Sequence, residues 1–206
     1  MRIAPNSRVP LTNGIAAIID HPLFQRLRGV RQLGFADRVY PSATHTRFEH
    51  SLGVYFRAIH YVHALWGDDF AGEYFRDKVR PRDIRSLLAA ALLHDLGQYP
   101  YSHVLEDVDR DHNGTLPATS AFSHEALTAN LLTQPTFRQD VLRECASGAP
   151  DFQHALDSLG VSAEDVASIL EGRAFGDLTP AATGILHSIV DGPIDADKLD
   201  YLQRDS

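Results

Sequence analysis

The sequence predicts an all-α fold, and three observations lead to that prediction. Apolar residues recur at three- and four-residue spacings through most of the chain, which is the rhythm of amphipathic helices. Residues 82–97 are rich in alanine and leucine, which have high helix propensity. No stretch shows the sustained apolar–polar alternation of a half-buried strand, and no internal repeat or low-complexity tract is present.

In the first half of the chain, the expected helices end at proline or glycine. The first covers residues 15–34 and is bent or broken near Pro22, because proline lacks the backbone donor that a helix interior needs. It stops around Gly34. The segments expected after it are a turn-rich stretch at 35–46, a helix at 48–66, a loop or short helix at 67–81 and the clearest helix at 82–97.

The second half begins with a charged and then turn-rich stretch at residues 107–121, which we expect to be a surface loop. Ser162 and Asp165 have the spacing of a capping box and predict a helix start. The helices expected here cover residues 123–132, 136–146, 151–156, 162–170, 180–190 and 195–205.

Length and composition predict one domain over residues 1–206, with a polar segment at residues 1–14. No apolar run approaches the about 20 residues that span a bilayer, so we expect no membrane contact. The N-terminal segment lacks the apolar region of a signal peptide, and the single cysteine, Cys145, cannot form an internal disulfide. These features predict a cytoplasmic location.

The charge and histidine content limit the partners and the metal chemistry. A formal net charge of −8 argues against a general nucleic-acid-binding surface, although a local cluster of cations can still bind an anionic substrate. Eleven histidines against one cysteine mean that any metal would be held by imidazole and carboxylate groups. Such ligands suit Fe, Mn, Ni, Zn or Mg better than ions that prefer thiolates.

One group of residues has the composition of a catalytic metal site. His94 and Asp95 close an otherwise apolar helix, where an unsatisfied polar group costs about 1–3 kcal/mol. Adjacent helical residues diverge by about 100°, so both can reach one ion at the helix end. His50 starts an upstream helix, and carboxylates cluster near residue 200. Two nitrogens and two carboxylate oxygens would leave positions open for water and substrate.

Structural alternatives exist for each of these residues. His50 taken alone is better explained as a core or capping histidine, and a His-Asp dipeptide occurs by chance. Asp197 and Asp195 both have the position of a helix N-cap or first-turn carboxylate, and Asp195 is the better candidate for a pure cap.

Five segments together resemble the HD-domain phosphohydrolases, and within them the deoxynucleoside triphosphate (dNTP) triphosphohydrolases. In family order and with similar spacing, the segments are "HPLFQRLRGVRQLG", "TRFEHSLGV", "LLHDLGQYPYSH", "FSHE" and "DADKLDYLQRD". The resemblance covers most of the chain and implies a helical bundle with a divalent metal ion between its helices. It assigns the metal ligands to His50, His94, Asp95 and Asp197.

The same resemblance implies roles in catalysis and substrate binding. Arg47 is placed against the substrate phosphates, His103 beside the scissile phosphate, and Glu106 where a family aspartate orients that histidine. His124 aligns with a further active-site histidine. The residues that align with family contacts to sugar, base and phosphates are Gln32, Leu33, Lys198, Tyr201 and Asp205. Gln98 departs from the pattern, because a histidine is usual there; glutamine can hydrogen-bond a phosphate or water but cannot shuttle a proton.

The function expected from these residues is metal-dependent hydrolysis of a nucleotide phosphoester, most specifically of a dNTP to a deoxynucleoside and triphosphate. Two alternatives remain open: another HD phosphohydrolase acting as a nucleotide phosphomonoesterase or phosphodiesterase, and a non-catalytic nucleotide sensor or assembly module. Family members continue beyond the segment "LDYLQRDS" with helices that complete the pocket and the oligomer. We therefore expect a chain truncated at its C-terminal end and a homo-oligomeric full-length protein.

Overall fold

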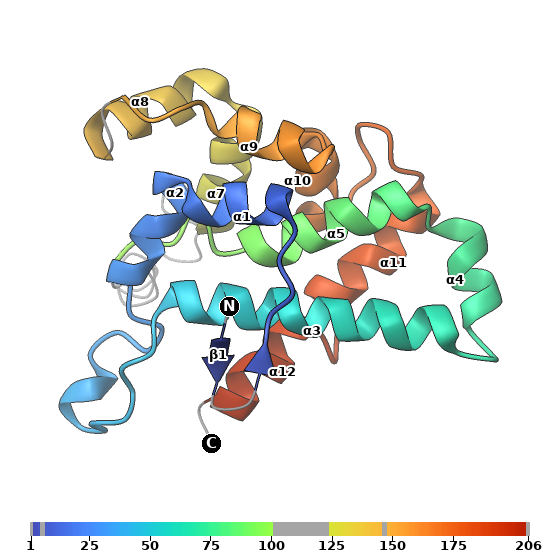
Figure 1. Cartoon of the computed structure of the whole chain (residues 1–206), viewed down its shortest axis with the longest axis horizontal. Coiled ribbons are helices and arrows are strands. Elements are labelled where there is room, and N and C mark those ends of the chain that lie inside the picture. The colour runs from blue at the N-terminus through green and yellow to red at the C-terminus, as the bar shows by residue number, and fades with distance from the viewer. Residues whose placement is uncertain (1, 5–6, 101–123, 146–147, 205–206) are drawn as a thin grey trace, which may run out of the picture.

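The computed structural model describes residues 2–4, 7–100, 124–145 and 148–204, and helices dominate these residues, as predicted (Figure 1). The elements are α1 (Asn13–Asp20), α2 (Pro22–Gln25), the 3-10 helices η1 (Arg26–Gly29) and η2 (Ala36–Arg38), α3 (Arg47–Gly67), α4 (Gly72–Lys78), α5 (Pro81–Leu93), α7 (His124–Thr133), α8 (Pro135–Cys145), α9 (Phe152–Leu159), α10 (Ala163–Glu171), α11 (Pro180–Val190) and α12 (Ala196–Arg204). No described helix combines the length and apolarity needed to cross a lipid bilayer.

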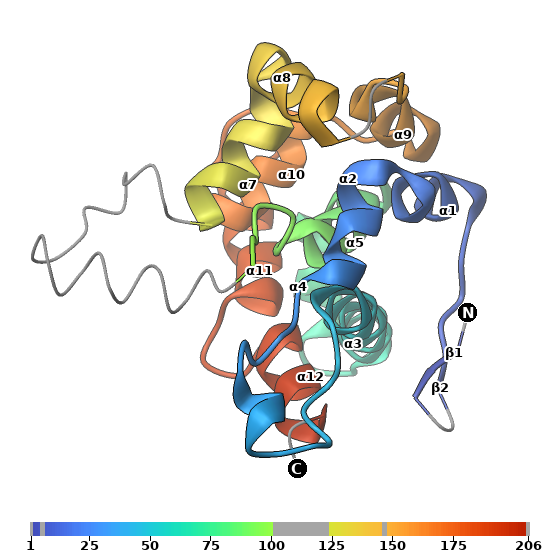
Figure 2. The same ribbon diagram turned by 90° about the vertical axis from the view of Figure 1, so that its left-hand side faces the viewer.

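Two long helices, α3 and α5, pack side by side at the centre of the molecule, and shorter helices surround them (Figure 2). Helix α12 lies along α3, while α10 and α11 cover α5. Helix α1 packs on α9. The C-terminal part of α5 is fully buried: every residue from Ala89 to Leu93 is 0% exposed. Burial of this apolar surface is the main favourable term in folding such a bundle.

The first predicted helix is broken where Pro22 predicted a break. His21 precedes the proline in an extended conformation, as residues before proline prefer, and it separates α1 from α2. Nδ1 of His21 accepts a hydrogen bond from the N–H of Leu23 at 3.2 Å, and Nε2 donates to the carbonyl of Pro150 at 2.9 Å. Helical structure ends at Gly29 rather than Gly34, so the predicted end was too late.

The other predicted helices are present with shifted ends. Residues 67–81, expected as a loop or short helix, contain α4. The helix expected over 82–97 ends at Leu93, and the chain turns away at His94. A short antiparallel hairpin, β1 (Arg2–Ala4) with β2 (Ser7–Arg8), was not predicted, because strands this short show no alternation. The predicted surface loop at 107–121 lies outside the described residues.

The turn that follows α5 approaches α7 closely at Gly97. Its N–H donates to Oγ1 of Thr128 at 2.8 Å, and this hydroxyl in turn donates to the carbonyl of His124 at 2.9 Å. A Cβ on Gly97 would overlap the His124 carbonyl oxygen and lie 2.5 Å from the Thr128 nitrogen. A residue without a side chain is therefore required at this crossing.

Gly97→Ala should destabilise the protein by about 1–3 kcal/mol, because the added methyl group forces α7 away from the end of α5. The free energy of unfolding, measured by urea titration, checks this. Gly184→Ala is the matched control: Gly184 lies in the exposed interior of α11, and an added Cβ meets nothing within 4 Å. Alanine there should stabilise by about 0.5–1 kcal/mol, since it is the better helix former. Equal effects of the two substitutions would contradict the close approach at Gly97.

Candidate metal centre

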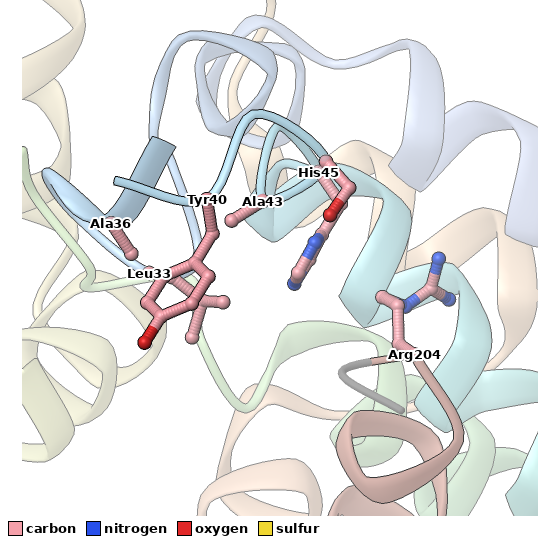
Figure 3. Close-up of a pocket in the computed structure, with 7 residues that line it drawn as sticks. Leu33, Ala36, Tyr40, Ala43, His45 and Arg204 are labelled. Atoms are coloured by element: carbon pink, nitrogen blue, oxygen red, sulfur yellow. The ribbon is translucent and has the colours of Figure 1, made fainter. Parts of the chain in front are cut away.

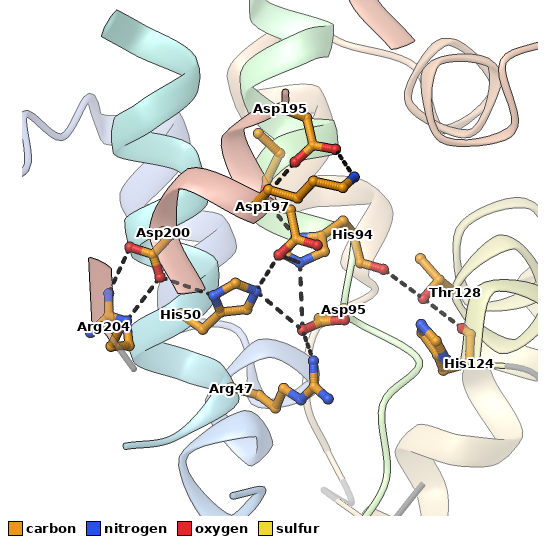
Figure 4. A network of polar contacts seen from close by, with 12 residues as sticks. Arg47, His50, His94, Asp95, His124, Thr128, Asp195, Asp197, Asp200 and Arg204 are labelled. Carbon is orange, nitrogen blue, oxygen red and sulfur yellow. Dashed lines mark hydrogen bonds and ion pairs between the residues drawn. The ribbon is translucent and has the colours of Figure 1, made fainter. Parts of the chain in front are cut away.

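Three helices place the four predicted metal ligands around one point (Figure 4). His50 lies in the first turn of α3, His94 and Asp95 follow α5, and Asp197 lies in the first turn of α12. Ligand atoms of His50, His94 and Asp95 all lie within 4.8 Å of one another. Oδ1 of Asp197 is 2.7 Å from Nε2 of His50 and 3.9 Å from Nε2 of His94.

A capping box fixes the start of α3 and so the position of His50. Oγ1 of Thr46 accepts a hydrogen bond from the N–H of Glu49 at 3.3 Å, and Oε2 of Glu49 accepts one from the N–H of Thr46 at 3.1 Å. This reciprocal pair satisfies two donors that a helix end leaves open. His50, with a relative exposure of 1%, is consequently held at a defined point of the helix.

Hydrogen bonds orient both imidazoles in the same way. Nδ1 of His94 is 3.0 Å from the carbonyl oxygen of Ala91, which can only accept, so Nδ1 carries the proton. Nδ1 of His50 is 2.9 Å from Oδ2 of Asp200 and is held in the same way by a carboxylate. In both residues Nε2 is the nitrogen turned toward Asp95 and Asp197, as metal ligation through Nε2 requires.

Asp95 is buried and pairs with Arg47. Nη1 of Arg47 donates to Oδ2 of Asp95 at 2.8 Å, and the two residues are 6% and 3% exposed. Burial alone would raise the pKa of Asp95, but electrostatic interactions with His94, Arg47 and His50 and the hydrogen bond from Arg47 outweigh it and hold that pKa well below its usual range. Asp95 is therefore a permanent anion, and Arg47, predicted to contact phosphates, is anchored beside it.

The electrostatics of His50 follow from the acids around it. Burial would lower the pKa of His50, but hydrogen bonds to Asp197 and Asp200 and the charge of Asp95 raise it to about 9. Burial likewise opposes the ionisation of Asp197, yet the pKa of Asp197 is lowered by its contacts with His50 and His94. The centre is thus an anionic pocket that favours a cation.

The donor set fits a divalent metal ion. Two imidazole nitrogens and carboxylate oxygens from Asp95 and Asp197 converge from three helices. Asp95, Asp197 and Asp200 carry three negative charges, and Arg47 and Arg204 balance two of them. The raised pKa of His50 lets a proton balance the third, and a metal ion at Nε2 would take the place of that proton. Nitrogen and oxygen donors of this kind suit Fe, Mn, Ni, Zn or Mg, as the sequence predicted.

A cavity of about 280 Å³ opens beside the ligands, between α7, α10, α11 and the start of α12. His94, His124 and Asp197 all line it. His124, the first residue of α7, was predicted to be an active-site histidine, and the cavity brings it together with two predicted ligands. Space for a substrate therefore adjoins the candidate metal position.

A second cavity of about 450 Å³ lies between residues 33–45 and the end of α12 (Figure 3). Leu33, one of the predicted substrate contacts, lines it together with Tyr40, His45 and Arg204. The preceding residue, Gln32, is partly buried, and its N–H donates to the carbonyl of His45 at 3.1 Å. Predicted substrate contacts from the first part of the chain thus border on α12.

The remaining predicted residues have varied positions. Oδ1 of Asp195 accepts the N–H of Lys198 at 2.6 Å, so Asp195 is the cap of α12, as its sequence position suggested, and the Lys198 ammonium also bonds to it. Gln98 is fully buried, and Tyr201 is half-buried on α12. His103, Glu106 and Asp205 lie outside the described residues.

Sequence reasoning missed Asp200 and Arg204. Asp200 contacts the imidazole of His50 directly, and Arg204 binds Asp200 through two hydrogen bonds of 2.8 and 2.9 Å. The available signal was their spacing: residues three and four apart on a helix share a face. Asp200 follows Asp197 by three residues and precedes Arg204 by four.

His50→Ala should abolish stable binding of Mn²⁺, because it removes the only ligand that α3 supplies among the residues described at this centre. Isothermal titration calorimetry on the metal-free protein checks this. His63→Ala is the matched control, because His63 lies exposed on the same helix and should leave Mn²⁺ affinity unchanged. Mn²⁺ binding of wild-type strength in His50→Ala would place the metal elsewhere.

Comparison with known proteins agrees with this geometry. Residues 47–176 match the model of the HD domain. The chain is 31% identical, over 96% of its length, to a putative HD domain-containing protein, L394, of Acanthamoeba polyphaga mimivirus. It is 30% identical, over 93% of its length, to the deoxynucleoside triphosphate triphosphohydrolase SAMHD1 homolog of Dictyostelium discoideum. Human SAMHD1 is 45% identical over 45% of the chain.

A solved structure supports the same relationship. The crystal structure of a phosphohydrolase from Bacteroides thetaiotaomicron has a TM-score of 0.62 and 29% identity over 97% of this chain. The chain spans 39% of that structure, 40% of the mimivirus protein and 33% of the Dictyostelium protein. Family model, relatives and the His–His–Asp cluster agree, and the chain belongs to the HD-domain phosphohydrolase superfamily.

Proposed function

We propose that this protein hydrolyses dNTPs to deoxynucleoside and triphosphate in a metal-dependent reaction. The observation that carries the proposal is the convergence of His50, His94, Asp95 and Asp197 beside a cavity that His124 also lines. The choice of dNTPs is supported by the relatives in human and Dictyostelium, which are named deoxynucleoside triphosphate triphosphohydrolases.

In this proposal the chain's own residues bind and orient the nucleotide. His50, His94, Asp95 and Asp197 would hold a divalent ion, which supplies Lewis-acid polarisation of phosphate oxygens. Arg47, fixed by its ion pair with Asp95, would place a positive charge where negative charge develops on the phosphate. Lys198 would add a second positive charge, and Gln32, Leu33, Gln98, Tyr201 and Asp205 are proposed to contact the nucleotide.

The reaction itself is an attack of water on the α-phosphorus. The bond between phosphorus and the 5′ oxygen breaks, and the electron pair goes to that oxygen. His103, oriented by Glu106, is proposed to deliver the proton to the 5′ oxygen. His124, which lines the cavity, is proposed to lie near the phosphates. The products are a deoxynucleoside and inorganic triphosphate, so atoms and charge balance without a further reactant.

Product analysis tests this function. The protein is incubated with each dNTP and Mn²⁺ or Mg²⁺, and inorganic triphosphate is measured by ion chromatography. Triphosphate from at least one dNTP supports the proposal, and its absence from all of them contradicts it. Phosphate from a monophosphate or a linearised cyclic nucleotide would instead identify another phosphohydrolase activity. Tight nucleotide binding without turnover under any metal would identify a sensor or assembly module.

Arg47→Ala should retain metal but lower kcat by about 100- to 1000-fold, the scale for removing one group that stabilises transition-state charge. Metal content by mass spectrometry and the triphosphate assay measure the two effects separately. Arg57→Ala, on the same helix and half-buried, is the control and should retain kcat. Loss of metal together with kcat in Arg47→Ala would make Arg47 a support of the ligand set rather than a phosphate contact.

A further inference from the structure

Both nitrogens of the His50 imidazole face carboxylates of α12. Oδ1 of Asp197 is 2.7 Å from Nε2, and Oδ2 of Asp200 is 2.9 Å from Nδ1 (Figure 4). The two aspartates are three residues apart and therefore share one face of the helix. Asp197 is on the metal side of the ring, whereas Asp200 is on the opposite side. Asp200 can reach a metal ion bound at Nε2 only through the imidazole.

Arg204 immobilises the Asp200 carboxylate. Its Nε donates to Oδ2 at 2.8 Å and its Nη2 to Oδ1 at 2.9 Å, a fork that engages both carboxylate oxygens. Nη2 also lies 3.2 Å from the carbonyl oxygen of Glu49, the residue before His50. Arg204 thus links Asp200 to the same turn of α3 that carries the imidazole. Asp200 is buried, with a relative exposure of 5%.

Gly53 leaves room for Asp200 and Arg204 to pack against α3. It lies three residues after His50, on the same face of the helix. A Cβ at this position would overlap Oδ1 and Cγ of Asp200 and lie 2.6 Å from Nη2 of Arg204. Any side chain at position 53 must therefore displace the carboxylate from His50.

We propose that Asp200, clamped by Arg204 and admitted by Gly53, is a positioning residue that keeps the proton of His50 on Nδ1 and aims Nε2 at the metal. The inference rests on the proposed metal-dependent function and adds residues that the ligand set does not include. His94 achieves the same orientation with the Ala91 carbonyl. A carboxylate partner at Nδ1 also raises the basicity of a ligating imidazole.

The affinity for Mn²⁺ tests the role of Asp200. Asp200→Ala should weaken Mn²⁺ binding by about 10- to 100-fold, the usual effect of losing such a partner. Asp200→Asn should lose less, because the amide oxygen still accepts the Nδ1 proton. Asp195→Ala is the matched control, since it removes the cap of α12 without touching the imidazole. An equal loss in Asp195→Ala, or wild-type affinity in Asp200→Ala, would overturn the proposal.

A double-mutant cycle tests the route through Gly53. Gly53→Ala should weaken Mn²⁺ binding to a similar extent, and Gly53→Ala combined with Asp200→Ala should bind no more weakly than Asp200→Ala alone. Additive losses would mean that Gly53 acts independently of Asp200, which overturns that part of the proposal.

The tautomer gives a readout that a purely structural role would not change. In the Zn²⁺-loaded wild-type protein, nitrogen-15 NMR of His50 should show a protonated Nδ1 whose proton exchanges slowly. In Asp200→Ala that proton should exchange rapidly with water. Zn²⁺ bound through Nδ1 would contradict the assignment. If Asp200→Ala weakens metal binding but the wild-type protein releases no triphosphate, only the proposed dNTP reaction is contradicted. If the wild-type protein releases triphosphate but Asp200→Ala binds metal normally, only the positioning role is contradicted.

Discussion

The contact of α12 with the first turn of α3 is the interaction on which the metal centre depends. It brings Asp197 and Asp200 to opposite sides of one buried imidazole, and it forms only because Gly53 leaves room for the Asp200 carboxylate. Because α3 also packs on α5, it places His50 next to His94 and Asp95. A change of the sequence register of α12 by one residue would rotate both aspartates by about 100° around the helix axis and so away from His50.

A site with this much buried charge is costly to fold and suited to bind a cation. Burial of an ionised carboxylate requires compensation, and Arg47 and Arg204 provide part of it for Asp95 and Asp200. The partial compensation leaves a negative field where the two Nε2 atoms converge. Functional sites often contain such buried charges, which make the protein less stable than an apolar core would. Binding of a ligand to the folded state then adds stability.

The two cavities border the same polar network from different directions. The cavity of about 280 Å³ touches His94 and Asp197, and the one of about 450 Å³ touches Arg204. The hydrogen bonds from Arg204 through Asp200 to His50 connect them. Groups that would contact a nucleotide in the proposed reaction therefore share partners with groups that would hold the metal.

Much of this arrangement follows from sequence, because helix spacing and caps are local. The apolar rhythm predicted α3 and α5, Pro22 predicted the break after α1, and the capping position of Asp195 predicted the start of α12. The pair His94–Asp95 stood out because polar residues rarely end so apolar a helix. Family resemblance added Asp197 and His124 to the candidate residues.

Tertiary structure decided which side chains meet. The sequence determined that Asp197, Asp200 and Arg204 share a face of one helix, yet it held no information on the helix that this face meets. The pairing of Arg47 with Asp95, residues 48 positions apart, and of His50 with Asp200, 150 positions apart, arises only when α3, α5 and α12 pack together. Local spacing fixes the direction of a side chain, whereas long-range packing selects its partner.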